Sequence, residues 1–406
     1  MKILVLGAGW MGRAAAYDLA RSRGVQHVGL ADQNAQALRD AQHFAGRPHV
    51  SAHRLDVARF SEVTSLMRRY DATIGAVSYK FNYPLAQCAV RAGCHFCDLG
   101  GNDTVVNREF TLNAAARKRQ VRIVPDCGLA PGMVSLVVAD GLSHFKKVDS
   151  VLIRVGGLPL KPEPPLNYQL VFSVGGLINE YVEPARVLRG GKIAFIESMT
   201  GLEELEFPAP FGTLEAFFTS GGASTLPLTL KGKVRELNYK TIRYPGHCEK
   251  FKTMIDLGLT SGEPISFQNA STWQQRVLKI APREVLEKLL VEKLPSGHPD
   301  CVLIRVTLRG ILNGKNKELG SFRNRSRASE KLSELSYQLI DYYDPKTHLT
   351  AMMRTTAVPI SIVAQMLTRG DVIGNRFGVL RQETSLQPRI FMNELKSRGI
   401  CFETNF

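Results

Sequence analysis

The sequence predicts an α/β protein in which a doubly wound parallel sheet is joined to a second, α+β domain. Strand-like and helix-like segments alternate six times between Lys2 and Pro125, as expected for a parallel sheet with helices on both faces. After Phe145, strand-like and loop-like segments dominate up to about residue 260, which is typical of a mixed or antiparallel sheet. A chain of 406 residues is too long for one ordinary core, so we expect two domains.

Each expected element rests on the period of its apolar residues. In the first part, strands are expected at 2–6, 28–31, 49–56, 72–77, 95–99 and 121–125, and helices up to 21 and at 35–44, 61–69, 83–92 and 104–119. In the second part, strands are expected at 148–155, 302–309 and 335–343, and helices at 282–294, 355–368 and 390–398. Few helical periods appear between residues 160 and 260.

A glycine-rich loop after the first strand carries the most specific functional signal. The residues of this loop expected to hold a dinucleotide are Gly7, Gly9, Trp10, Met11 and Gly12. Gly7 permits the sharp turn, Gly9 leaves room for a pyrophosphate at the helix N-terminus, and Gly12 allows close packing of helix and strand. Asp32 follows the second strand, where an acid accepts the ribose hydroxyls. A glycine turn that binds nothing is the alternative, but strand, spacing, acid and helix together favour a bound dinucleotide.

The acid at the second strand also bears on which dinucleotide is bound. A carboxylate at Asp32 would repel a ribose 2′-phosphate, and the next residues, Gln33 and Asn34, supply no cation. The sequence therefore favours NAD over NADP.

The carboxyl ends of the later strands bring further residues to the same crevice. The additional residues expected at the cofactor are Asp56, Val77, Ser78, Asp98 and Gly100. Asp56 either faces the adenine or only forms a turn. Tyr79 and Lys80 stand where nicotinamide and substrate would meet, and Asp126 ends the sixth strand.

Two segments of the second part could hold a substrate. Ser220, Gly221 and Thr225 lie in a loop rich in hydroxyls and glycine, which could present N–H and O–H groups to a carboxylate or could be an ordinary turn.

The second segment runs from Lys240 to Lys250. Its Arg243 could fork onto a carboxylate, with Tyr244 beside it, and His247 could transfer a proton. A single histidine at a helix start is, however, often only structural.

Composition argues against several other classes of protein. The net charge is +15, but the basic residues are spread along the chain, so we expect no nucleic-acid partner. The seven cysteines are scattered and read as reduced thiols, and the C-x-x-C pair Cys94 and Cys97 has no second pair to complete a zinc site. We therefore expect no metal. No apolar run approaches the ~20 residues of a membrane span, and the chain opens on a predicted strand, so we expect a cytoplasmic protein.

Several motifs resemble the saccharopine dehydrogenase family over nearly the whole chain. They are the glycine loop at 7–12 and the segments 127–132, 155–159, 171–173 and 241–247. Within the family, the segments 98–101, 162–166, 219–222 and 249–251 are most similar to the L-lysine 6-dehydrogenase branch. Saccharopine reductases usually carry an acid where this chain has Ala130, which favours the lysine branch. Asn102 and Asp103 stand where a histidine is expected in lysine dehydrogenases.

The resemblance implies a dinucleotide-binding Rossmann domain at 1–130 with 351–406, and a substrate-binding and dimerisation domain at 131–350, in a homodimer or larger homo-oligomer. It implies NAD-dependent oxidative deamination of the ε-amino group of L-lysine with release of ammonia. A saccharopine-type enzyme that forms or cleaves a secondary amine is the alternative, and a non-catalytic NAD-binding regulatory protein is the second. The ε-ammonium must lose a proton before hydride can leave, for which Asp126 and His247 are candidate bases, with Tyr79 and Lys80 as orienting or relay groups.

Overall fold

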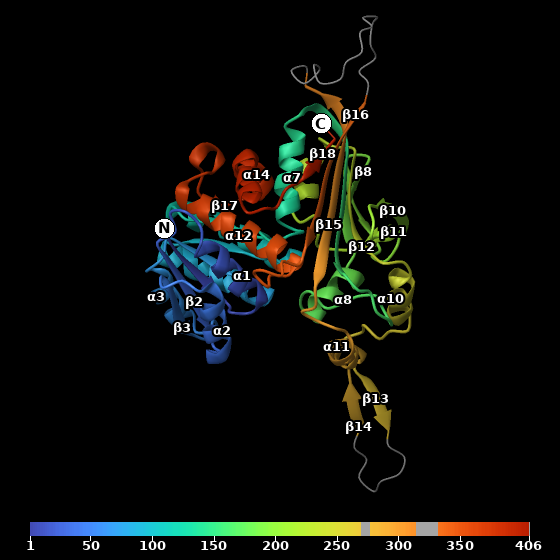
Figure 1. Cartoon of the computed structure of the whole chain (residues 1–406), viewed down its shortest axis with the longest axis horizontal. Coiled ribbons are helices and arrows are strands. Elements are labelled where there is room, and N and C mark those ends of the chain that lie inside the picture. Colours follow the sequence, from blue (N-terminus) through green and yellow to red (C-terminus); the bar gives the residue numbers. More distant parts are fainter. Residues whose placement is uncertain (269–276, 314–331, 406) are drawn as a thin grey trace, which may run out of the picture.

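The computed structural model describes residues 1–268, 277–313 and 332–405, and it has two lobes, each built on its own sheet (Figure 1). The first lobe contains a seven-stranded sheet and the second a nine-stranded sheet. No helix in these described ranges is long and apolar enough to cross a membrane.

The first sheet is entirely parallel and has the order β17-β6-β5-β4-β1-β2-β3. Its strands are β1 (Lys2–Leu6), β2 (His27–Asp32), β3 (Val50–Arg54), β4 (Ala72–Gly75), β5 (His95–Asp98), β6 (Arg122–Val124) and β17 (Gly378–Val379). The chain reverses its winding direction between β1 and β4, which is where ligands bind in such sheets. The prediction of a doubly wound parallel sheet is confirmed.

Helices connect these strands, and their bounds agree with the sequence pattern except in one place. They are α1 (Trp10–Leu19), α2 (Ala35–Ala45), α3 (Phe60–Met67), the 3-10 turn η1 (Tyr79–Phe81), α4 (Asn82–Ala92), α5 (Asp103–Phe110) and α6 (Asn113–Lys118). The single helix expected at 104–119 is divided into α5 and α6. At the division the hydroxyl of Thr111 bonds the carbonyl of Arg108, so a local side-chain contact replaces the continuing helical ladder.

The second sheet is mixed and has the order β10-β11-β12-β7-β15-β16-β18, with β8 and β9 beside β12. Its strands are β7 (Phe145–Pro159), β8 (Ala185–Arg189), β9 (Lys192–Ile196), β10 (Glu203–Phe207), β11 (Gly212–Phe218), β12 (Glu236–Arg243), β15 (Asp300–Leu312), β16 (Ser333–Tyr342) and β18 (Glu403–Thr404). Only β12 and β7 run parallel; the other pairs are antiparallel. The hairpin β13 (Ile265–Gln268) and β14 (Val277–Ile280) projects from this lobe beyond α11 (Pro282–Lys293) (Figure 1).

Three helices interrupt the region in which the sequence showed few helical periods. They are α8 (Val174–Val182), α9 (Leu226–Leu230) and α10 (His247–Asp256). The side chain of Ser173 caps α8 by accepting a hydrogen bond from the N–H of Gly176 at 3.3 Å. Short length and glycines at 175 and 176 weaken its helical period, although its apolar face is fully buried.

The last part of the chain touches both lobes. It contains α12 (Ala351–Arg369), the turn η3 (Ile373–Asn375), α13 (Gln382–Ser385) and α14 (Pro388–Ser397), and α7 (Met133–Leu142) packs nearby. Helix α12 lies between the parallel sheet and β15 (Figure 1), in contact with α1, β4, β5 and β15. Strand β17 joins the first sheet, and β18 joins the second.

A buried ion pair fastens the end of α14 to α1. The Nε of Arg398 donates to Asp18 at 2.8 Å, and the hydroxyl of Ser361 on α12 donates to the same carboxylate at 2.5 Å. The side chains of Arg398 and Asp18 are only 13% and 12% exposed. We expect Arg398→Ala to lower the free energy of unfolding by about 3–5 kcal/mol, because it leaves a buried carboxylate without its cation. Urea unfolding measures the change.

The control is Arg389→Ala, which removes an exposed arginine from the same helix. It should change the free energy of unfolding by no more than about 0.5 kcal/mol. Equal losses in the two variants would show that the ion pair does not fasten α14.

Candidate functional site

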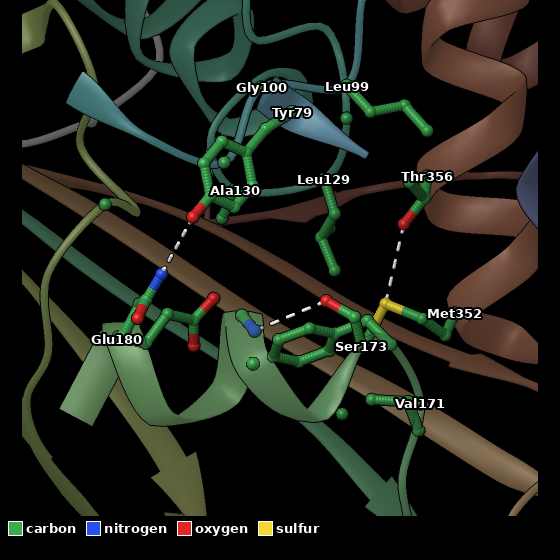
Figure 2. A pocket seen from close by; sticks show the side chains of 18 of the residues that line it. Tyr79, Leu99, Gly100, Leu129, Ala130, Val171, Ser173, Glu180, Met352 and Thr356 are labelled. Carbon is green, nitrogen blue, oxygen red and sulfur yellow. Dashed lines mark hydrogen bonds between the residues drawn. The ribbon is translucent and has the colours of Figure 1, made fainter. Parts of the chain in front are cut away.

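A cavity of about 1030 Å³ lies between the carboxyl edge of the parallel sheet and the second lobe. One wall comes from the loops that follow β1, β4, β5 and β6, and the other from β7, β12, α8 and α11. Figure 2 shows Tyr79, Leu129 and Ala130 on the first wall, facing Ser173 and Glu180 of the α8 segment. Met352 and Thr356 of α12 close one side.

The glycine loop has the geometry of a dinucleotide cradle. A Cβ on Gly12 would lie 1.9 Å from the carbonyl oxygen of Gly7, so helix and loop touch there. A Cβ on Gly9 would meet nothing within 4 Å, and Gly9, Trp10 and Met11 line the cavity. The space above Gly9 at the start of α1 thus suits a pyrophosphate, whose charge the helix N-terminus favours.

The two acids expected beside the adenosine are both held by backbone groups. Asp32 ends β2 and accepts hydrogen bonds from the N–H groups of Ala8 and Asn34, each at 2.8 Å. Asp56 accepts from the N–H of Ala58 at 2.9 Å, which is the turn contact that was its alternative role. Neither acid is among the residues that line the cavity.

At the other strand ends, Val77, Ser78, Tyr79 and Gly100 line the cavity. Asp98 does not, because it is fully buried beneath the loop. The Tyr79 hydroxyl faces α8 and accepts a hydrogen bond from Asn179 at 3.4 Å (Figure 2).

Asp126 is a cavity-lining acid in an unusual environment. It is 3% exposed, has a φ of +62°, and accepts a hydrogen bond from the hydroxyl of Ser224. Burial, followed by the charge of Asp98, raises the pKa of Asp126 to about 8. Near neutral pH it can therefore exist in either protonation state.

Arg243 is the buried cation of the cavity. It is 3% exposed; its Nε donates to the hydroxyl of Tyr181 at 2.9 Å, and its Nη1 to the carbonyl of Ile242 at 2.9 Å. Its guanidinium carbon lies 4.7 Å from the ring centroid of Tyr168. No hydrogen bond with a described residue uses Nη2, and Arg243 lines the cavity with Ser220 and Gly221. A guanidinium so held can bind a carboxylate.

A second titratable group of the cavity, Glu180, was not among the site residues expected from the sequence. It is half-buried on α8, where burial raises its pKa to about 7, against the opposing effect of Arg243. Figure 2 shows it across the cavity from Leu129 and Ala130. The apolar spacing of Leu177 and Tyr181 was the signal that could have placed Glu180 at the edge of a buried helix face.

His247 does not have the environment of a base in this cavity. It is 1% exposed, its Nδ1 bonds the carbonyl of Leu166 at 3.0 Å and its Nε2 bonds the hydroxyl of Tyr181 at 3.1 Å. Burial, then the charge of Arg243, lowers its pKa to about 3. Both ring nitrogens are hydrogen-bonded to groups that do not line the cavity. The structure therefore supports a structural role for His247, as a neutral imidazole that holds Tyr181, which in turn accepts a hydrogen bond from Arg243.

Three further expected site residues also lie off the cavity lining. Lys80 is exposed, with its ammonium 5.4 Å from the ring centroid of Phe81. Thr225 donates to the carboxylate of Glu383 at 2.9 Å. The hydroxyl of Tyr244 donates to the carbonyl of Pro159 at 3.0 Å, so these contacts support structural roles for all three.

The described residues contain no group of three or more histidine, cysteine, aspartate or glutamate side chains placed to hold a metal ion. All seven cysteines are unpaired thiols, and Cys94 and Cys97 are buried in β5 and the turn before it.

Two glycine substitutions separate cofactor binding from folding. Gly9→Ala should leave thermal stability unchanged, because its Cβ meets nothing within 4 Å, but should weaken NADH binding at least about tenfold by obstructing the pyrophosphate. Gly12→Ala should lower both, because its Cβ overlaps the Gly7 carbonyl. NADH fluorescence titration and thermal unfolding measure the two effects. Unchanged NADH affinity in Gly9→Ala would refute the cradle.

Comparison with known proteins agrees with this geometry. Residues 3–124 match the family model described as the saccharopine dehydrogenase NADP binding domain, and residues 128–400 match the saccharopine dehydrogenase C-terminal domain. In fold, the chain is similar to apo saccharopine dehydrogenase (L-Glu forming) from Saccharomyces cerevisiae, with a TM-score of 0.76 at 19% identity over 100% of this chain and 99% of that one.

Curated relatives are longer than this chain. Mitochondrial alpha-aminoadipic semialdehyde synthase of Mus musculus is 21% identical over 99% of this chain, which spans 47% of that protein. Saccharopine dehydrogenase [NADP(+), L-glutamate-forming] of Pyricularia oryzae is 23% identical over 68% of this chain and 62% of its own length. With both domain models matched over most of its length, the chain belongs to the saccharopine dehydrogenase family.

Proposed function

We propose that this chain is an NAD(P)-dependent oxidoreductase of the saccharopine type, which forms or cleaves a secondary amine between an amino acid and an oxo compound. One observation carries the proposal: a single cavity combines the dinucleotide cradle at Gly9, the buried guanidinium of Arg243, and the titratable carboxyls of Asp126 and Glu180. Family membership and the names of the relatives support the same reaction class.

The chemistry explains why these groups belong together. Bound NAD(P)⁺ supplies the hydride acceptor. Hydride leaves a carbon next to nitrogen only when the nitrogen lone pair is free, so the substrate ammonium must first lose a proton. A carboxylate with a pKa near 7 is suited to accept it, and we assign this role to Glu180. Arg243 holds the substrate carboxylate, and Asp126 serves the second proton transfer, at the water that adds to the imine carbon.

We propose NAD rather than NADP, because the carboxylate of Asp32 is fixed at the end of β2 by two backbone N–H groups. We also propose the domain division at residue 130, with residues 351–406 returning to the first domain. The pairing of β17 with β6 and the packing of α12 on α1 support that division.

The charges of the cavity favour a second candidate, oxidative deamination of the ε-amino group of L-lysine. Arg283 is occupied by Glu287 at 2.8 Å, and Asp103 by Arg186 at 2.7 Å. Among the charged groups that line the cavity, the ones left over are Arg243 and three acids, which are Asp126, Glu180 and Glu183. Saccharopine has three carboxylates and would find one unpaired cation here, among three carboxyl groups of which two titrate near neutral pH. Lysine, with one carboxylate and two amines, matches this lining better.

A screen for NADH and NADPH formation with lysine, saccharopine, ornithine and related diamines, with ammonia assayed alongside, separates the candidates. Saccharopine turnover without ammonia supports the first, and lysine turnover with stoichiometric ammonia supports the second. In either case Arg243→Lys should raise KM about tenfold, because a lysine cannot form the bidentate hydrogen bond of a guanidinium with the substrate carboxylate. No turnover of any amine with tightly bound NAD would refute both and leave a regulatory protein.

The pH dependence tests Glu180. Below a pH of about 7 this carboxyl is protonated and cannot accept a proton, so oxidative kcat/KM should fall as pH drops through that value. Glu180→Gln should lower kcat by about 10² or more and remove this limb of the profile. Glu183→Gln, which neutralises the neighbouring half-buried acid, should keep the limb. A limb that persists in Glu180→Gln would assign the proton acceptor elsewhere.

A further inference from the structure

Two carboxyl groups behind the cavity are buried, and no cationic side chain among the described residues balances their charge. Asp98 ends β5 and Glu109 lies on α5, and both side chains are 0% exposed. Among the described residues, no hydrogen-bond donor reaches Oδ2 of Asp98 or either carboxyl oxygen of Glu109. The side-chain oxygen of the neighbouring Asn82 is likewise unpartnered. Several buried acceptor atoms therefore lie near one another with no hydrogen-bond donor among the described residues.

Both carboxyls cannot be ionised there. No lysine, arginine or histidine among the described residues forms an ion pair with either group. Two like charges in contact, each stripped of water, are strongly unfavourable, and one proton between them removes the repulsion and satisfies the facing oxygens. Burial first, and then the charge of Asp98, raise the pKa of Glu109 to about 11, so the proton resides mainly on Glu109.

The other oxygen of Asp98 organises the cavity wall. Oδ1 accepts hydrogen bonds from the N–H of Gly100 at 2.7 Å, the amide of Asn82 at 2.9 Å and the N–H of Asp126 at 3.3 Å. Gly100 and Asp126 are in close contact, since a Cβ on Gly100 would lie 1.9 Å from Oδ1 of Asp126. A displacement of Asp98 would thus move both cavity residues.

We propose that Glu109 and Asp98 share one proton, and that the pair acts as a positioning device that fixes Gly100 and Asp126 and holds a negative charge behind Asp126. Neither residue lines the cavity. The shared proton follows from the buried geometry alone, whereas its effect on turnover rests on the function proposed above for Asp126.

The charges around Asp126 come from several elements. Asp98 faces it from β5, Asp103 from α5 and Glu383 from α13, and each raises its pKa, while the Ser224 hydroxyl lowers it. Asp103 is paired with Arg186, and Glu383 accepts hydrogen bonds from the hydroxyls of Thr225 and Thr229. Of these three acids, Asp98 is the one that faces Glu109.

Removing the Glu109 donor should therefore act on Asp126 through Asp98. The proton that Glu109 would share with Asp98 lowers the pKa of Asp98, so without it Asp98 takes up a proton more readily. The negative charge beside Asp126 is then weaker, and the pKa of Asp126 falls.

Infrared difference spectroscopy of the 406-residue chain tests the shared proton without any substrate. At a pH of about 9, above the pKa of about 8 of Asp126, the wild type should retain a protonated-carboxyl C=O band that Glu109→Gln lacks. Glu180→Gln, which removes a cavity acid outside the pair, should keep this band. If the wild type lacks the band, or Glu109→Gln retains it, the shared proton is refuted, whatever the enzyme's substrate proves to be.

The pH profile of kcat/KM tests the positioning role. Because the pKa of Asp126 is about 8, its proton transfer should give the profile a second limb near pH 8. Glu109→Leu should shift this second limb toward lower pH by at least half a unit and raise KM, while Glu109→Gln, whose amide can still donate to Asp98, should restore the wild-type profile. Val106→Ala, a truncation of another buried residue on α5, is the control for a structural defect alone and should not shift the limb. An unshifted limb in Glu109→Leu, or equal shifts in the Leu and Gln variants, would overturn the role; if Glu109→Leu does not fold, Glu109→Ala replaces it.

Discussion

Desolvation of carboxyl groups at the carboxyl edge of the parallel sheet is the constraint on which the site depends. Parallel strands deliver their ends to one edge, and here three of those ends bring Asp32, Asp98 and Asp126 toward it. Asp32 is partly exposed, whereas Asp98 and Asp126 are almost completely removed from water. The cost of burying a charge raises the pKa values of Asp98 and Asp126, and so decides which of these two acids can exchange a proton near neutral pH.

The second lobe completes the cavity by supplying a buried cation, Arg243. Strand β12 ends at Arg243, which is held by Tyr181 and, through it, by His247. Such a chain of hydrogen bonds fixes a guanidinium before any ligand arrives, which lowers the entropic cost of binding a carboxylate. The packing of α12 against both sheets, with the buried pair of Arg398 and Asp18, keeps that guanidinium facing the dinucleotide cradle.

Most of the fold and the cofactor loop could be predicted from the sequence because their signals are local. Strand alternation needs only apolar periods, and the glycine loop needs only residues within one turn of each other. The side chains of the cavity wall were harder to predict, because their burial and their partners are set by tertiary contacts. His247 and Glu180 show this: both lie on helices in the second lobe, yet packing engages both nitrogens of the histidine and leaves the glutamate at the cavity. Glu109 gave no local signal, since only its contact with Asp98 makes it unusual.

This chain shares its fold with solved and curated relatives at low sequence identity, so the side chains of its cavity can differ from theirs. At 19% identity the fold is still similar, with a TM-score of 0.76, so the backbone architecture tolerates wide sequence change. The charge of the cavity depends on single side chains, so it does not tolerate such sequence change. One guanidinium facing several carboxyls attracts a different ligand from a cavity with several cations, because each unmatched buried charge costs more than a matched one returns. Under the proposed function, substrate choice therefore depends on single cavity side chains such as those of Ala130 and Glu180.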